Sequence, residues 1–513
     1  MEEPLTPGCY VTVSLDGSTF SLPDACRTGR GAAVVLDPVA VARVRDRAEL
    51  ADQISRTRAV YGRTTAVGAN RDVTLGGGGV RRSAVESDGR GDDDGDDGEE
   101  AVSLRLWRSH AGAVGEPLDA ANVRAALGIR VNQLLTGGSG ASADLVQALT
   151  GLVDGSPEAL PVIRRHGDLG TGDLSALAQV GLALAGERPR TDGSLRRTLG
   201  PKLSDALPLL SSNAFTLAAA ALGWEGLQRL CTAAVPVCAL SWLALEGGVE
   251  AVGPAVGTVT PFGGAIRVAA STAGLLDGNR LAPRHVQDFF GLRAWPQSHG
   301  PLLDALAELR RVTEAQVNAP SENPIYLPAR GPQAADAAHH GGFLLTYLPL
   351  AIDTTLLALV RSAQSSMSRV KHLLTDPTTG LPRFLASGSA GSSGLLIAEY
   401  AAGSALAQVR TQAGAPTSLL TTSVSGEVED DASFAGLAAA RLGPAAAAYR
   451  QLLAVELVCA VRALRMRGRT ARGRLAAVLE ACEALPRELE DRDLGFDFDL
   501  AQALVEALGS RPA

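Results

Sequence analysis

Apolar residues recur at helical spacing over most of the chain from Ala101 onward. Stripes with an apolar side chain every three or four residues indicate helices that turn one face toward a core. Short breaks that contain Gly or Pro separate the stripes, and several stripes are long enough to favour parallel helices that form the core of an oligomer. The pattern predicts helices over residues 101–113, 119–135, 142–153, 173–186, 203–222, 224–247, 265–276, 299–317, 334–374, 390–414, 432–466, 471–484 and 497–508.

The N-terminal part has a different pattern. Apolar and polar residues alternate from Tyr10, and Asp16-Gly17 is a dipeptide typical of tight turns, so we expect a β-hairpin within residues 10–37. Asp37-Pro38 then supplies the N-cap and the first position of a helix. Residues 75–100 are rich in Gly and Asp and cannot bury a core, which indicates a surface loop, either a plain insertion or a lid beside Tyr61.

These patterns predict a mainly α fold in three parts. Residues 1–200 would hold the hairpin, the acidic loop and the first helices. Residues 201–466 would form the central bundle of long helices and the oligomer core, and residues 467–513 would form the C-terminal helices.

Composition narrows the class of protein. Apolar residues make up 46% of the chain and aromatic residues only 4%, which favours helices packed through small side chains. The net charge of −8 argues against a nucleic-acid partner. The most apolar runs, 229–246 and 343–361, contain Pro, Asp or Glu, so we interpret them as buried helices and expect no membrane partner. Six scattered cysteines without a CxxC pair and an acidic N-terminus lead us to expect reduced thiols and a cytoplasmic location.

The segment His166–Gln179 is the most informative stretch. A Gly- and Asp-rich turn runs into an apolar helix, and Asp173 and Ser175 stand where capping groups are expected. Gly170-Thr171-Gly172 within it allows a tight turn. Taken alone, the segment is a common loop-to-helix junction; we call residues 166–175 the Thr171 loop.

Motifs along the chain give the segment a context. They are Tyr61-Gly62-x-x-Thr65, Ser109-His110 with Gly115, Arg124 and Gly137-Gly138-Ser139-Gly140, Gln287 to Gly300, Asn318-x-x-x-Glu322-Asn323-Pro324, and Pro416 to Ser433 with Glu429-Asp430. In order and spacing these motifs are similar to those of the aromatic amino acid ammonia-lyases and aminomutases, and the resemblance covers roughly residues 10–510.

The resemblance implies a long-helix bundle of the ammonia-lyase (fumarase/aspartase-like) type and a homotetramer with active sites completed by three subunits. It makes Tyr61 the catalytic base and Arg293 the clamp for the substrate carboxylate, a task suited to a planar, charged side chain. The substrate would be small and amino-acid-derived. The remaining implied substrate-binding positions are His110, Ser211 or Asn213, Gln287, Phe290, Phe343, Leu344 and Glu429.

One departure concerns the prosthetic group. The family builds an electrophilic methylidene-imidazolone from Ala-Ser-Gly, where this chain has Gly170-Thr171-Gly172. Loss of water from Thr would leave a bulkier, less electrophilic alkene than loss from Ser. Phe262, Phe290 and Leu344 also replace polar family residues. We therefore expect no methylidene-imidazolone and no other cofactor. His339-His340 is no metal pair either, because adjacent helical residues diverge by about 100°.

Three functions remain open. The first is an enzyme of specialised metabolism that works without the prosthetic group, using Tyr61 and Arg293 for elimination, isomerisation or cyclisation of an amino-acid-derived or aromatic substrate. The second is an ammonia-lyase or aminomutase with an atypical group built from Gly170-Thr171-Gly172. The third is a non-catalytic homologue with a structural or regulatory role. Retention of Tyr61, Gln287, Arg293 and Glu429 favours altered function over none.

Overall fold

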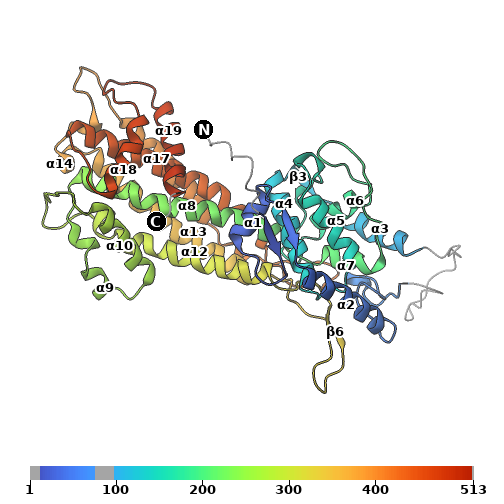
Figure 1. Cartoon of the computed structure of the whole chain (residues 1–513). Helices are drawn as coiled ribbons and strands as arrows, with labels where there is room; N and C mark the ends of the chain where they lie inside the picture. The colour runs from blue at the N-terminus through green and yellow to red at the C-terminus, as the bar shows by residue number, and fades with distance from the viewer. Residues whose placement is uncertain (1–11, 76–97, 511–513) are drawn as a thin grey trace. The chain divides into compact units, whose positions relative to one another are not determined.

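A computed structural model describes residues 12–75 and 98–510. The chain divides into two compact units, each built from several segments (Figure 1). The first unit takes residues 1–222, 311–349 and 417–439, and the second takes 223–310, 350–416 and 440–513. Helices dominate both units, which confirms the mainly α class. The predicted boundaries at residues 200 and 466 stay predictions.

The first unit begins with a small parallel sheet rather than the predicted hairpin. Strand β1 (Val13–Leu15) pairs in parallel with β2 (Val34–Leu36), and helix α1 (Leu22–Gly29) connects them. The helix forms because Ser21 caps it, accepting a bond from Asp24 N, while the Asp24 carboxylate reaches back to the Ser21 backbone. Asp16 bonds Ser18 N and Thr19 N instead of making a hairpin turn.

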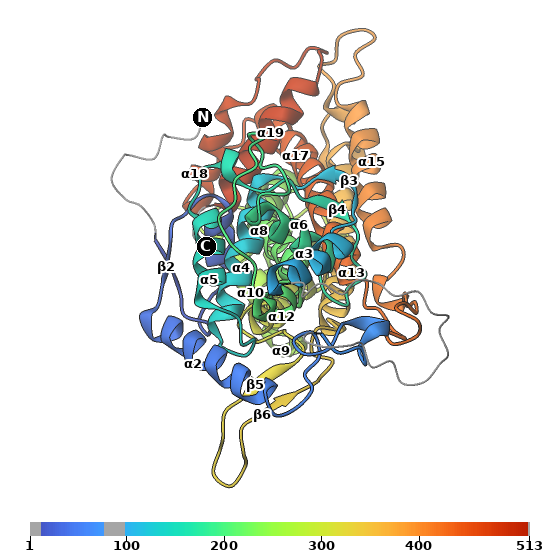
Figure 2. The ribbon, with the colours of Figure 1, turned by 90° about the vertical axis from the view of Figure 1, so that its right-hand side faces the viewer.

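Helix α4 (Ala120–Leu135) lies at the centre of the first unit and is buried from Val123 to its end. It packs against α1 and α5. Strands β5 and β6 form a hairpin against α2 (Figure 2). The other elements of this unit are α2 (Pro38–Ser55), η1 (Gly68–Asn70), α3 (Glu99–His110), β3 (Val114–Pro117), α5 (Ala143–Val153), η2 (Pro157–Ala159), β4 (Arg164–His166), α6 (Leu174–Leu184), α7 (Leu203–Leu210), β5 (Ile325–Leu327), β6 (Asp336–Ala338), η5 (Thr417–Leu419) and most of α16 (Ala435–Ala440).

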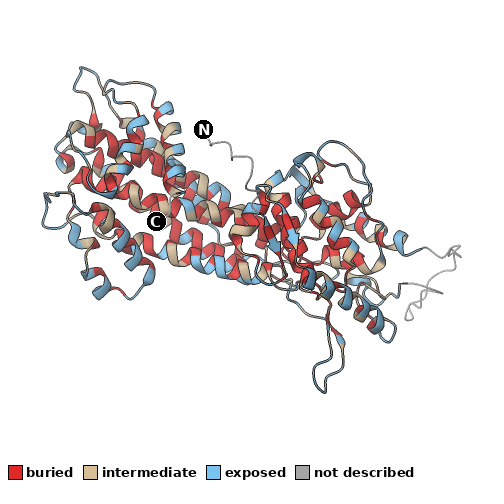
Figure 3. Ribbon diagram, viewed as in Figure 1, coloured by how far each residue is buried: buried red, intermediate tan, exposed pale blue. Residues whose placement is uncertain are grey.

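The second unit is helical, and α17 (Leu442–Met466) packs in it between α15 and α19. Buried residues, red in Figure 3, follow the inner faces of its helices. The helices that lie wholly or largely here are α8 (Ala214–Leu245), η3 (Val249–Val252), α9 (Ala255–Val259), α10 (Gly263–Leu276), α11 (Phe290–Arg293), α12 (Trp295–Val317), α13 (Tyr347–Leu373), α14 (Asp376–Thr379), η4 (Arg383–Leu385), α15 (Leu396–Ala413), α18 (Arg474–Ala481), η6 (Cys482–Ala484) and α19 (Gly495–Gly509).

The predicted helix 203–222 is interrupted, because α7 ends at Leu210 and α8 begins at Ala214. Two further predicted boundaries are also wrong. Helix α8 runs through Gly223, because that glycine serves close packing: a Cβ there would lie 2.4 Å from Leu442 Cβ. The long stripe from residue 334 is helical only from Tyr347, since the residues before it form β6 and the turn that follows.

The apolar helices belong to the core. Two segments, Leu203–Leu245 and Ala435–Met466, are long and apolar enough to cross a membrane, yet 89% and 72% of their most apolar windows are buried inside the protein. The five cysteines in the described residues are buried and form no disulfide, which agrees with the expectation of reduced thiols; Cys9 lies outside the described residues.

Candidate active site

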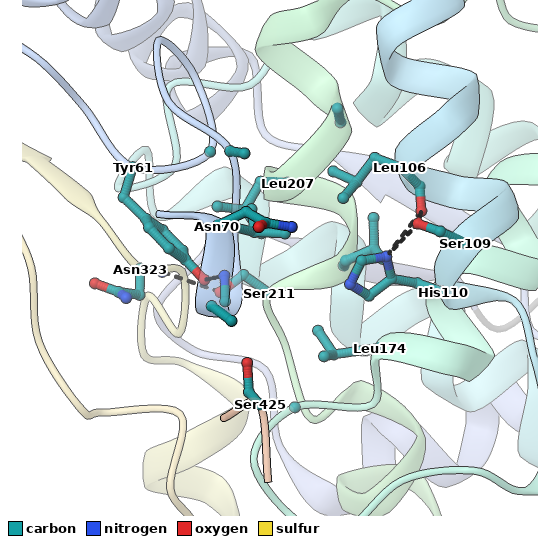
Figure 4. A pocket seen from close by; sticks show the side chains of 18 of the residues that line it. Tyr61, Asn70, Leu106, Ser109, His110, Leu174, Leu207, Ser211, Asn323 and Ser425 are labelled. Atoms are coloured by element: carbon teal, nitrogen blue, oxygen red, sulfur yellow. Dashed lines mark hydrogen bonds between the residues drawn. The ribbon is translucent and has the colours of Figure 1, made fainter. Parts of the chain in front are cut away.

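A cavity of about 1420 Å³ opens within the first unit. Its walls come from the segment after Tyr61, helix α3, the Thr171 loop, the end of α7 and the segment around Ser425 (Figure 4). Segments far apart in the sequence therefore bring several of the predicted site residues together. Those that line the cavity are Tyr61, His110, Thr171, Gly172, Ser211, Phe343 and Glu429.

Tyr61 reaches into the cavity from a tight turn. The turn is closed by Val60, whose N donates to Thr64 Oγ1 at 2.7 Å and whose carbonyl accepts from Thr64 N at 2.9 Å. The Tyr61 hydroxyl accepts a bond from Gly68 N at 2.8 Å. Burial raises the pKa of Tyr61, the charge of Glu429 raises it further, and the Gly68 bond and Arg71 oppose the rise. Tyr61 is therefore a neutral phenol here and needs a change of charge nearby to act as a base.

His110 ends α3 on the opposite side of the cavity (Figure 4). Its Nδ1 lies 2.9 Å from the carbonyl oxygen of Leu106 and 3.0 Å from Ser109 Oγ. A carbonyl oxygen only accepts, so Nδ1 carries the proton in the neutral ring and Nε2 is left as an acceptor. Such a ring can receive a hydrogen bond from a bound side chain.

The Thr171 loop is fixed by the segment that precedes α16. Ser433 Oγ donates to the carbonyl oxygen of Gly170 at 2.8 Å, and Phe434 N donates to that of Leu169 at 2.8 Å. Gly170 has a φ of +85°, and a Cβ there would lie 2.3 Å from Ser433 Oγ. Only glycine fits this position. Gly170 is itself buried, while Thr171 and Gly172 face the cavity.

Two carboxyls hold the end of this loop, and not in the way that the sequence predicts. Asp173 caps no helix with its side chain: Asp173 Oδ2 and Oδ1 accept from Thr216 N and Thr216 Oγ1, each at 2.8 Å. Asp168 caps α6 instead, because Asp168 Oδ1 accepts from Ser175 N at 2.9 Å and from Ser175 Oγ at 3.0 Å. Burial raises the pKa of both carboxyls, and the neighbouring charge of Asp168 helps to raise that of Asp173 to about 7.

The two residues predicted as alternatives for the asparagine position, Ser211 and Asn213, lie beside the Thr171 loop, where Asp173 N donates to the Ser212 carbonyl at 2.6 Å. Ser211 lines the cavity, and its Oγ accepts from Asn323 N at 3.0 Å. Asn213 is 1% exposed, donates to the Phe343 carbonyl at 2.7 Å and does not line the cavity. Phe343 lines it, whereas Leu344 does not.

Gln287, Phe290 and Arg293 form a separate cluster in the second unit. Arg293 Nε donates to the Asp288 carbonyl at 2.9 Å, and the guanidinium lies 4.5 Å from the centre of the Phe290 ring. With its amide oxygen turned toward Arg293, Gln287 accepts from the guanidinium at 2.7 and 3.2 Å. These three residues do not line the cavity of the first unit, and their role in substrate binding stays a prediction.

Sequence reasoning missed Asn70 and Ser425, which both line the cavity. The dipeptide Ser425-Gly426 is typical of turns and could have pointed to Ser425. The structure has such a turn, in which Ser425 has a φ of 56°. The acidic loop lies mostly outside the described residues. Within residues 12–75 and 98–510 no group of three His, Cys, Asp or Glu could hold a metal. His339 Nε2 accepts from Tyr61 N at 3.4 Å, while His340 Nε2 lies 2.6 Å from the Glu322 carbonyl.

Comparisons with known proteins agree with this arrangement. Residues 21–486 match a family model described as aromatic amino acid lyase. Histidine ammonia-lyases from Symbiobacterium thermophilum and Gloeobacter violaceus are each 30% identical, over 95% and 96% of this chain and 96% and 95% of their own. Among solved structures, ergothionase from Treponema denticola (23% identical, TM-score 0.83, 97% of this chain and 99% of that one) and tyrosine aminomutase from Streptomyces globisporus (22%, 0.84, 97% of each) have the same fold.

These matches correct the prediction that no prosthetic group forms. Histidine ammonia-lyases and aminomutases, which this chain resembles, carry the methylidene-imidazolone. The loop also fits it. Ring closure uses the backbone carbonyl of Gly170 and the backbone nitrogen of Gly172, which are unaffected when Gly and Thr replace the Ala and Ser of the family. Thr171 keeps the β-hydroxyl that must leave. The glycines at 170 and 172, with φ of +85° and +115°, allow the tight turn. The predicted absence of a cofactor is therefore wrong.

Proposed function

The chain belongs to the aromatic amino acid lyase family, and from that premise we propose that it eliminates or moves the amino group of an aromatic or heteroaromatic amino acid, using a group formed from Gly170-Thr171-Gly172. The observation that carries the proposal is that Tyr61, His110, Thr171 and Glu429 line one cavity. The first of the three functions, an enzyme that works without the prosthetic group, is no longer proposed, because the prediction that the group is absent is wrong.

The electrophilic group, when formed, supplies an acceptor that makes the amino group a better leaving group. The chain's own residues move the protons. In this proposal Glu429, which lines the same cavity, takes a proton from the substrate ammonium. Its negative charge raises the pKa of Tyr61, so a protonated Glu429 eases ionisation of the phenol. Tyr61, with its oxygen held by Gly68 N, then removes the proton from the substrate β-carbon.

The walls of the cavity favour a flat side chain. Leu106, Leu174 and Leu207 offer apolar surface, and His110 Nε2 offers one acceptor (Figure 4). This combination suits an aromatic ring that carries a hydrogen-bond donor. Carboxylate binding by Arg293 and the homotetramer remain parts of the same proposal, supported by the family alone. The cytoplasmic location is a further part of it, supported by the cysteines of the described residues, which form no disulfide.

The test is activity of the purified protein with phenylalanine, tyrosine and histidine, followed by arylacrylate absorbance, by released ammonia and by formation of the β-amino acid. Replacing Tyr61 by Phe should lower turnover roughly 10²- to 10⁴-fold, the usual contribution of a general base. Tyr347→Phe is the matched control, because Tyr347 is 72% exposed and does not line the cavity. Full activity of Tyr61→Phe would exclude Tyr61 as the base. No turnover of any amino acid by the unmodified protein would favour a non-catalytic homologue.

A further inference from the structure

The Thr171 loop carries one carboxyl that faces the cavity and one that does not. Asp168 and Thr171 both line the cavity, whereas Asp173 is 1% exposed and is directed at Thr216. Two bonds from Ser175 to Asp168 Oδ1 fix the Asp168 side chain at the start of α6. A half-buried, oriented carboxylate thus lies three residues before the residue that must lose its hydroxyl.

Formation of the ring requires two losses of water. In the first, the Gly172 nitrogen bonds to the carbonyl carbon of Gly170, and that carbonyl oxygen leaves as water with the amide hydrogens of Gly172 and Thr171. The hydrogen bond from Ser433 Oγ to this oxygen polarises the carbonyl that is attacked. In the second, Thr171 loses its Cα proton and its β-hydroxyl as a carbon–carbon double bond forms. The second loss is harder for Thr than for Ser, because the extra methyl group on the double bond must be accommodated in the tight loop.

We propose that Asp168 promotes the second dehydration, taking the Cα proton of Thr171 and returning it to the departing hydroxyl, so that the loop matures despite the threonine. The inference rests on the proposed function, since it concerns the same group. No external oxidant or reductant is needed, because the proton that Asp168 takes leaves again in the second water. Burial raises the pKa of Asp168, which suits a group that must hold a proton for part of the reaction.

The test is the intact mass and the near-ultraviolet spectrum of the purified full-length chain, neither of which depends on turnover. Four variants are compared with the unmodified protein: Asp168→Asn, Asp168→Glu, Thr171→Ser, and Asp168→Asn combined with Thr171→Ser. Asn keeps an oxygen for the Ser175 bonds but accepts no proton. We expect a mass lower by two waters in the unmodified protein. We expect at least tenfold less matured chain in Asp168→Asn, partial recovery in Asp168→Glu, and full maturation when Ser replaces Thr171 in either background.

The outcomes separate the two claims. Equal maturation of Asp168→Asn and the unmodified protein would overturn the role of Asp168 and leave the proposed function standing. An unmodified protein without the mass deficit would overturn the proposed function and this inference together. Failure of the double variant to mature would assign Asp168 a merely structural role in the loop and overturn the inference as well.

Discussion

Two sites, one in each unit, hold charged side chains away from solvent in opposite combinations. The first unit also buries the ion pair Arg130–Glu322. In the second unit, Arg369 and Glu456 are both 0% exposed and make a bidentate ion pair, with Nε to Oε1 at 2.5 Å and Nη2 to Oε2 at 2.9 Å. Ser241 and Ser366 donate to the same carboxylate. In the first unit, Asp168 and Asp173 are two acids at one loop, and the bonds they accept come from Ser175 and Thr216, both uncharged.

The difference separates a structural site from a functional one. A buried ion pair whose remaining lone pairs and protons are all bonded holds a core in one arrangement and has no reason to exchange protons. At the loop, burial and the neighbouring charge of Asp168 raise the pKa of Asp173 to about 7, which brings proton exchange toward neutral pH. Polar groups in an energetically unfavourable combination therefore indicate a catalytic site better than a fully bonded ion pair does.

The largest effect is expected when the ion pair between Arg369 and Glu456 is broken. Replacing Arg369 by Met leaves Glu456 buried without its cation, which should lower the free energy of unfolding by about 3–5 kcal/mol. Urea denaturation of the variant and the unmodified protein measures the loss. Arg267→Met is the control, because Arg267 pairs with Asp304 at a surface where both side chains are largely exposed and should matter by less than about 1 kcal/mol. Equal losses in both variants would remove the contrast between the two sites.

An intermediate effect is expected at Asp173. Thr216→Val keeps the shape of the side chain and the Thr216 N bond but removes the hydroxyl donor to Asp173 Oδ1. A buried carboxylate oxygen without its donor should cost about 1–3 kcal/mol of stability. The thermal midpoint of unfolding reports it. Thr411→Val is the matched control, since the Thr411 hydroxyl bonds only its own helix at an exposed position. A Thr216 variant as stable as this control would contradict the bonding described for Asp173.

The sequence predicts the helices and a part of the site. Stripe periodicity gives the helices because burial of one face is a local pattern, and Asp37 is recognisable as an N-cap, which it is, accepting from Ala40 N at 2.8 Å. The family motifs point to Tyr61 and Glu429. Pairings between distant residues leave no such pattern: nothing in the sequence joins Arg369 to Glu456. Asp168 rather than Asp173 caps α6, because the loop folds back and brings Asp168 to Ser175. The hydrogen bond from Ser433 to the Gly170 carbonyl, made by a residue distant in the sequence, holds this loop.

The smallest expected effect is a change in how protein stability depends on pH at the Asp168 and Asp173 site. Asp173 holds its proton more tightly in the folded protein, with a pKa of about 7 against an ordinary 3.8, so stability falls as pH rises from about 4 to about 7. Asp168→Asn keeps an oxygen for the Ser175 bonds and removes the charge beside Asp173, which lets Asp173 ionise more easily. It also removes the carboxyl of Asp168, whose own pKa is raised by burial, so both effects relieve a cost that grows as pH rises. The variant should gain on the order of 1 kcal/mol relative to the unmodified protein at about pH 8 and nothing at about pH 4, because one pKa unit corresponds to about 1.4 kcal/mol. Thermal unfolding across this range measures the difference. A gain that does not change with pH would come from packing and would contradict the raised pKa of these two carboxyls.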